Sequence, residues 1–104
     1  MKKMLIPLLA CSAVLVLQSA LAETGEELYK TKGCTVCHAI DSKLVGPSFK
    51  EVAARYAGQA GIADTLAAKI KAGGSGNWGQ IPMPPNPVSE AEAKTLAEWV
   101  LTHK

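Results

Sequence analysis

The residues Cys34-Thr35-Val36-Cys37-His38 decide how the rest of the sequence is interpreted. Two thiols three positions apart, followed at once by an imidazole, form the attachment sequence of a c-type haem. The thiols of Cys34 and Cys37 can form thioether bonds to the two vinyl groups on one edge of a porphyrin. The adjacent His38 can then bind the iron as its proximal ligand. The motif therefore predicts one covalently attached haem c.

Two other interpretations of the motif stay open at this point. Cys34 and Cys37 could form a structural or redox-active disulfide, although that motif is typical of a βαβ setting, and no such pattern is visible. The two thiols could instead bind zinc together with His38 and His103, although adjacent ligands and a penultimate residue make poor tetrahedral geometry. Both alternatives predict a colourless protein, which separates them from the haem hypothesis.

The first 22 residues have the pattern of a secretory signal peptide. Two lysines precede an apolar run over residues 4–17, and Ala20-Leu21-Ala22 supplies the small residues of a cleavage site. The run is short for a membrane span, and no basic stop-transfer cluster follows it. We expect the leader to be removed and residues 23–104 to form one periplasmic domain. A lipoprotein signal ending at Cys11 is the weaker alternative.

Length and charge exclude several classes of protein. The 104 residues have a formal net charge of +2, and the two lysines of the leader account for it, so nothing indicates nucleic-acid binding. The length excludes large enzyme folds such as a TIM barrel. A domain of this size buries only about 60–65% of its unfolded surface. Because the remaining cysteines allow one disulfide at most, we expect a cofactor to fill the core.

Helix caps and apolar spacing predict an all-α fold. Ser or Thr followed three residues later by Glu is typical of a helix start. This pattern predicts helices that begin at Thr24-x-x-Glu27, at Ser48-x-x-Glu51 and at Ser89-x-x-Glu92. A fourth helix is expected from about Ile62 to Ala72, because two glycines follow it.

The segment from Gly73 to Val88 is rich in glycine and holds four prolines within six positions. Taken alone it would be a surface loop, because proline suits neither a helix interior nor a central strand. Met83 stands between two of these prolines and is the only methionine outside the leader. We therefore expect its thioether to be the second axial ligand of the iron. His103 is the alternative ligand, and we expect it to be a solvated residue of the tail.

Ligation by His38 and Met83 would determine the class of function. A six-coordinate iron has no vacancy for oxygen or peroxide, and a thioether ligand raises the reduction potential. The chain is therefore expected to carry single electrons and not to be an enzyme. An enzyme or gas sensor with an open iron is the alternative, and it would require Met83 to be off the iron.

Further stretches of sequence carry a family pattern. They are Lys32–Asp41, Val45–Pro47, Tyr56–Gly61, Trp78–Asn86 and Leu96–Leu101, and the Ile-Pro-Met-Pro-Pro-Asn run is the most specific. With these stretches, residues 23–104 resemble the small bacterial class I c-type cytochromes of the c-551/c-552 type. The resemblance implies an all-α class I cytochrome c fold, with four to five helices wrapped around one covalently attached haem.

The resemblance also implies roles for residues around the haem. The carbonyl of Pro47 should accept a hydrogen bond from the imidazole of His38, which fixes its orientation. The amide of Asn86 is expected near the sulfur of the methionine ligand. Trp78 should direct its indole N–H at a propionate. Lys69 stands where some relatives have arginine, so its own contact with a propionate is expected to be looser.

Transient redox proteins are the partners that the resemblance implies. The donor would be one such as a membrane cytochrome complex, and the acceptor one such as nitrite reductase, a peroxidase or a terminal oxidase. We expect a monomer that neither binds nucleic acid nor inserts stably into a membrane. Four lysines lie near the haem-binding segments, but acidic residues balance them, so we predict docking with modest salt dependence. These lysines are Lys30, Lys32, Lys43 and Lys50.

Overall fold

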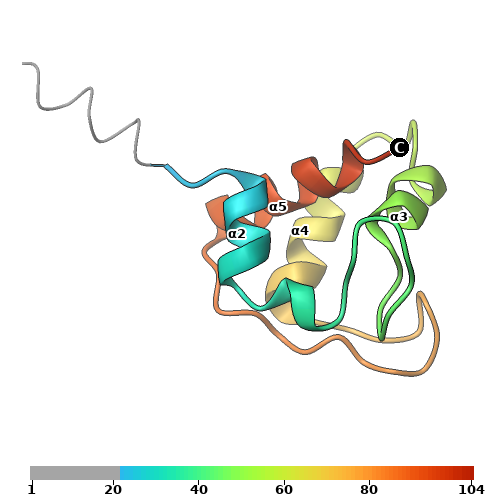
Figure 1. The fold of residues 1–104 in the computed structure, drawn as a ribbon. Coiled ribbons are helices and arrows are strands. Elements are labelled where there is room, and N and C mark those ends of the chain that lie inside the picture. Colours follow the sequence, from blue (N-terminus) through green and yellow to red (C-terminus); the bar gives the residue numbers. More distant parts are fainter. Residues whose placement is uncertain (1–21) are drawn as a thin grey trace, which may run out of the picture.

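The computed structural model describes residues 22–104, and the expected signal peptide lies outside the described residues except for its last position. Four α-helices and one short 3-10 helix make up this part of the chain (Figure 1). In chain order they are α2 (Gly25–Thr31), η1 (Cys34–Val36), α3 (Phe49–Arg55), α4 (Ile62–Ala72) and α5 (Glu90–Leu101). The prediction of an all-α fold is confirmed.

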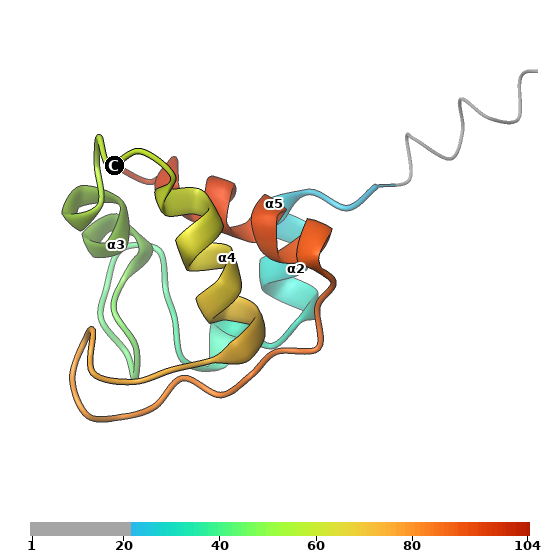
Figure 2. The same ribbon diagram turned by 180° about the vertical axis from the view of Figure 1, so that it is seen from behind.

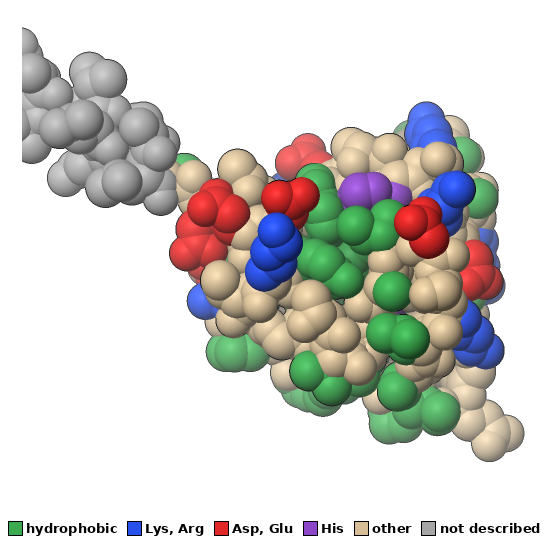
Figure 3. Space-filling view, viewed as in Figure 1, with side chains coloured by type: hydrophobic (Ala, Val, Ile, Leu, Met, Phe, Trp, Pro, Cys, Tyr) green, Lys and Arg blue, Asp and Glu red, His purple; other side chains and the backbone are tan. Residues whose placement is uncertain are grey.

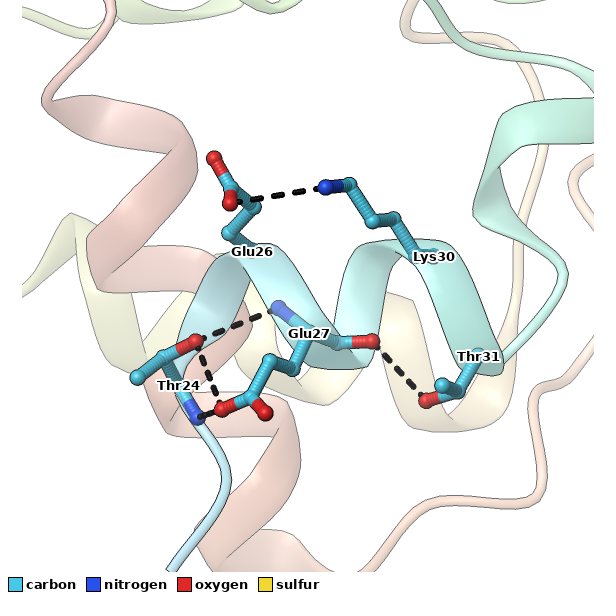
Figure 4. Close-up of polar contacts among 5 residues, drawn as sticks. All are labelled: Thr24, Glu26, Glu27, Lys30 and Thr31. Carbon is cyan, nitrogen blue, oxygen red and sulfur yellow. Dashed lines mark hydrogen bonds and ion pairs between the residues drawn. The ribbon is translucent and has the colours of Figure 1, made fainter.

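Three of the α-helices begin at the capping boxes that the sequence predicted. Thr24, Ser48 and Ser89 each accept a hydrogen bond from the backbone N–H three residues on. The glutamate at that position accepts one in return from the backbone N–H of the cap residue. Figure 4 shows this exchange at the start of α2. Because the first turn of a helix leaves backbone donors free, such caps fix where a helix begins.

The two ends of α4 are marked by glycines and not by a side-chain cap. Gly61 precedes it with a φ of 73°, and Gly73 follows it with a φ of 79°. Both residues have a positive φ, which glycine adopts without strain. The backbone N–H of Gly73 donates to the carbonyl of Lys69 and closes the last turn. The end of α4 therefore agrees with the prediction from the sequence.

The helices pack at one side of the molecule, and the long loops lie at the other (Figures 1 and 2). α5 contacts α2, α3 and α4. The core consists of two buried clusters, which are Leu28, Val88, Ala93 and Leu96 in one, and Phe49, Val52 and Val100 in the other. Gly25 lies where α2 meets α5, and a β-carbon there would be 2.5 Å from Cγ of Trp99. The glycine therefore permits the close approach of these two helices.

The position of His103 differs from the prediction. Its ring is half-buried and lies edge-on to Trp99, with the ring centroids 4.4 Å apart. It also stacks with Phe49 at 6.3 Å, and its Nε2 atom is buried without a hydrogen-bond partner among residues 22–104. The expectation of a solvated tail residue was wrong, because α5 carries the chain end back over the aromatic side chains of the core.

Candidate haem-binding site

The Cys-x-x-Cys-His motif lies in the tight turn that follows α2. α2 ends at Thr31 with Lys32 as its C-cap, and Gly33, with a φ of 81°, turns the chain into η1. The backbone N–H groups of Cys37 and His38 then both donate to the carbonyl of Cys34, at 3.2 and 2.9 Å. This turn gathers the two thiols and the imidazole into one short, hydrogen-bonded segment.

Cys34 and Cys37 are both half-buried free thiols in the structure, so they form no disulfide. Burial raises the pKa of the Cys34 thiol above its ordinary value, which keeps it protonated at neutral pH. Within residues 22–104 no three His, Cys, Asp or Glu side chains come together in a way that could hold a metal ion. The structure thus supports neither the disulfide nor the zinc interpretation.

The imidazole of His38 is fixed on three sides. Its Nδ1 atom lies 2.8 Å from the carbonyl oxygen of Pro47. Because a carbonyl only accepts hydrogen bonds, Nδ1 carries the proton, and Nε2 keeps its lone pair for a metal. The ring stacks on Phe49 with centroids 5.2 Å apart. It also lies against Gly46, where a β-carbon would be 2.6 Å from Cε1.

Met83 belongs to the segment between α4 and α5, residues 73–88, here called the Met83 loop. The backbone N–H of Gly74 donates to the carbonyl of Met83 at 3.0 Å, and Met83 donates back to Gly74 at 2.7 Å. Gly73 packs closely on the part of the loop around Met83, and a β-carbon at Gly73 would be 2.5 Å from the carbonyl oxygen of Met83. These contacts hold the half-buried Met83 against the end of α4.

A cavity of about 570 Å³ lies between the motif and the Met83 loop. Its lining includes Cys34, Cys37 and His38 from the motif, together with Met83 from the loop. The remaining walls are largely apolar and include Phe49, Val52, Leu66, Ile70, Leu96 and Val100. The volume is in the range of cofactor sites, and the donor set offers two thiols, a neutral imidazole and a thioether. The residues present therefore fit a haem c.

Asn86 holds the Met83 loop through its side chain. Its amide nitrogen donates to the carbonyls of Ile70 at 2.8 Å and Pro84 at 3.3 Å. The approach of this amide to the sulfur of Met83 stays a prediction. Asn86 ties the Met83 loop to α4, because the end of a helix leaves carbonyls that need a donor.

Trp78 and Lys69 both lie on the wall of the cavity. The ring of Trp78 is edge-on to Tyr56, with centroids 6.3 Å apart. The guanidinium carbon of Arg55 lies 4.4 Å from its ring centroid. The contact of Trp78 with a propionate stays a prediction.

Three residues with roles at the site were missed by sequence reasoning. The hydroxyl of Tyr29 donates to the carbonyl of His38 at 2.9 Å and so ties the motif to α2. Gly46 makes room for the imidazole, and Arg55 contacts the Met83 loop. A signal was available for Gly46, which lies in the Val45–Pro47 stretch, and for Arg55, which is the only arginine in the sequence.

Comparison with known proteins identifies the family of this chain. The sequence model of the Cytochrome c family matches residues 22–104. The chain is 98% identical to cytochrome c-551 of Azotobacter vinelandii over 82 residues, which are 79% of this chain and all of that protein. It is 62% identical over its full length to cytochrome c-551 of Stutzerimonas stutzeri, which is also covered in full.

A crystal structure of cytochrome c552 from Nitrosomonas europaea has the same fold. It superposes with a TM-score of 0.73 at 54% sequence identity, and the match covers 76% of this chain and 99% of that one. The chain therefore belongs to the cytochrome c family, as a small class I c-type cytochrome that carries electrons and is not an enzyme.

Proposed function

We propose that residues 23–104 hold one haem c in the cavity and act as a periplasmic one-electron carrier. Cys34 and Cys37 would bind the porphyrin covalently, and His38 and Met83 would bind the iron. The observation that carries this proposal is the common lining of one cavity by these four side chains, with Nδ1 of His38 held by Pro47 at 2.8 Å. When bound, the haem supplies an iron that takes up and releases one electron.

The protein side chains account for the choice of electron transfer over bond chemistry. Nε2 of His38 and the thioether of Met83 would occupy both axial positions, which leaves no place for a substrate. The hydrogen bond to Pro47 fixes the tautomer and the orientation of the imidazole. The apolar side chains of the wall keep water away and, with the thioether, favour the reduced state.

An exposed apolar patch at the mouth of the cavity supports transient docking of redox partners. Leu44, Val45 and Ile81 line the cavity yet are 49%, 52% and 67% exposed, and Val36 between the two cysteines is 75% exposed. In Figure 3 the lowest part of the molecule, formed by the loops, shows hydrophobic and uncharged groups. Such a patch suits a small, short-lived interface.

Three of the four lysines near the haem-binding segments contribute little charge to this proposed docking surface, and Lys43, which lines the cavity, has no ion pair within residues 22–104. Lys30, Lys32 and Lys50 lie 3.5 to 4.0 Å from carboxylates of Glu26, Glu92 and Asp41. Exposed pairs of this kind are nearly neutral as seen by a partner. The proposed partners are a donor such as a membrane cytochrome complex and an acceptor such as nitrite reductase, a peroxidase or a terminal oxidase. The carrier would meet them as a monomer.

The periplasmic location rests on the leader. We propose that residues 1–22 direct export and are then removed, because they combine a basic start, an apolar run and a small-residue cleavage site. Among residues 22–104 no helix has the length and apolar character that crossing a membrane requires.

Visible spectra of the purified protein test the proposal. The oxidised form should show a far-red iron–sulfur band, and the reduced form should show a sharp α-band that added carbon monoxide does not shift. A carbon monoxide shift would reveal an open iron and favour a sensor or an enzyme. A colourless protein from a host with working haem attachment would contradict the haem proposal as a whole.

A further inference from the structure

Arg55, the last residue of α3, reaches across to the tip of the Met83 loop, residues 75–81. Its Nη1 atom donates to the backbone carbonyl of Asn77 at 2.6 Å. Its guanidinium carbon lies 4.4 Å from the ring centroid of Trp78 and 5.6 Å from that of Tyr56. One side chain therefore contacts the loop both through a hydrogen bond and through the face of its planar group.

The base of the Met83 loop has its own attachments. The paired hydrogen bonds between Gly74 and Met83 join its two arms to each other beside the end of α4. Asn86 ties the second arm to α4, because it donates to the carbonyls of Ile70 and Lys71. The backbone of the base therefore keeps these bonds when the tip moves, but Ile81 and Pro82 join the tip directly to Met83, so a displaced tip can shift the Met83 side chain.

The tip is held differently. Within the tip, the backbone N–H of Gly76 donates to the carbonyl of Gly79 at 2.9 Å. Among residues 22–104, the hydrogen bond from Arg55 is the one that joins the tip to another element. The two glycines of the tip, at positions 76 and 79, give its backbone wide conformational freedom, so the tip depends on this external contact.

The contact between Arg55 and the tip also affects the wall of the cavity. Tyr56, the residue that follows α3, and both Asn77 and Trp78 in the tip belong to its lining. Arg55 thus joins two walls, and separation of the tip from α3 would open the cavity to water at that point.

We propose that Arg55 is a positioning residue that clamps the tip of the Met83 loop to α3 and so keeps Met83 on the iron. The part about the iron rests on the proposed function. The guanidinium is suited to this role because its edge donates to a carbonyl while its face stacks on an indole. A lysine at this position would keep the charge but lose the stacking plane and its fixed donors.

The test compares the holoprotein with its Arg55→Lys, Arg55→Gln and Lys50→Gln variants. Lys50 is on the same helix, is exposed, and is absent from the cavity lining, so Lys50→Gln controls for the loss of one positive charge. The first measurement is amide hydrogen exchange of the reduced protein. We expect exchange at Gly76, whose N–H donates to Gly79 within the tip, to be about tenfold faster in both Arg55 variants, as for the loss of one charge-assisted hydrogen bond. Exchange at Gly74 and Met83 should be unchanged.

The second measurement is the affinity of the oxidised protein for added imidazole, which competes with a methionine for the iron. We expect both Arg55 variants to bind imidazole about five to ten times more tightly than the parent, and Lys50→Gln to match the parent. Parent-like exchange at the tip in both Arg55 variants would overturn the clamp. So would a parent-like Arg55→Lys, because the charge alone would then account for the effect.

The two proposals fail in different ways. If the parent shows no far-red band, the ligation by Met83 is wrong, yet the exchange rates at the tip still decide whether Arg55 holds the loop. A second outcome is that the far-red band is present and the tip loosens, but the imidazole affinity does not change. Arg55 would then hold the loop without positioning Met83, and that part of the inference would be overturned.

Discussion

The imidazole ring of His38 lies directly against the backbone of Gly46. A β-carbon at position 46 would be 2.6 Å from Cε1 and 3.0 Å from Nδ1 of the ring. The next residue, Pro47, accepts the hydrogen bond from Nδ1 at 2.8 Å. Two consecutive residues therefore set the orientation of the imidazole, one by leaving space and the other by offering a carbonyl.

We predict that Gly46→Ala displaces the ring and breaks its hydrogen bond to Pro47. Overpacking of this kind costs about 1–3 kcal/mol in the free energy of unfolding. Denaturant unfolding measures the cost, and the chemical shifts of His38 in the reduced protein report the ring. Ser42→Ala, an exposed change in the same segment, is the control. Unchanged stability together with unchanged His38 shifts would contradict the close contact.

A second prediction concerns Gly25, where α2 meets α5. An alanine at a helical glycine usually stabilises a helix, by about 0.5–1 kcal/mol. Here the added β-carbon would overlap the side chain of Trp99, with 2.5 Å to its Cγ and a still shorter distance to its Cβ. We expect Gly25→Ala to destabilise the protein by about 1–3 kcal/mol in thermal or denaturant unfolding. A gain in stability would show that the two helices can separate without cost.

The features of the fold that can be predicted from the sequence are those that depend on residues close together in the chain. The three capping boxes depend on residues three positions apart, so the starts of α2, α3 and α5 were predicted correctly. The end of α4 at Gly73 is likewise a local property of glycine. The motif and Met83 were singled out because the chemistry of an iron requires those side chains.

Features that depend on distant residues could not be predicted in this way. His103 is half-buried because Phe49 and Trp99, from two other helices, lie beside the end of the chain. Arg55 meets the carbonyl of Asn77 only after α4 and its flanking turns have brought the loop back. The hydrogen bonds of Asn86 to the end of α4 depend on the same return of the chain.

A third prediction concerns the pH dependence of stability through Glu27 in the cap of α2 (Figure 4). The backbone N–H and then the hydroxyl of Thr24 lower the pKa of Glu27 below its ordinary value of 4.5. A carboxyl with a lowered pKa stabilises the folded state above its unfolded pKa, and this contribution is lost as the pH falls through the folded pKa. We expect Glu27→Gln to be less stable than the parent at neutral pH.

The difference between Glu27→Gln and the parent should shrink as the pH is lowered below 4.5. Urea unfolding between pH 7 and pH 3 measures this change. Glu26→Gln serves as the control, because Glu26 only pairs with the exposed Lys30, at 3.5 Å, and such pairs contribute little. A difference that is independent of pH would contradict a role for the ionised carboxylate.

A fourth prediction tests the apolar patch without a biological partner. Electron self-exchange between oxidised and reduced copies requires their cavity mouths to meet. Ile81→Lys places a positive charge in the patch. When two copies meet, their two lysines would repel each other, and each ammonium group would lose water as the interface forms. We expect self-exchange, measured by NMR line broadening, to slow about tenfold or more, the effect of roughly 1.4 kcal/mol. Ala68→Lys adds the same charge on the exposed side of α4 and should change the rate far less.

The last prediction separates the two possible sixth ligands. Met83→Leu conserves volume, so we expect the packing part of its cost in stability to stay below about 1.5 kcal/mol. It should nevertheless abolish the far-red band and allow the reduced protein to bind carbon monoxide. His103→Gln should keep the band, because His103 packs on Trp99 and Phe49 and does not belong to the cavity lining. A band that survives in Met83→Leu but disappears in His103→Gln would reverse the assignment, and would require the end of α5 to leave the aromatic core.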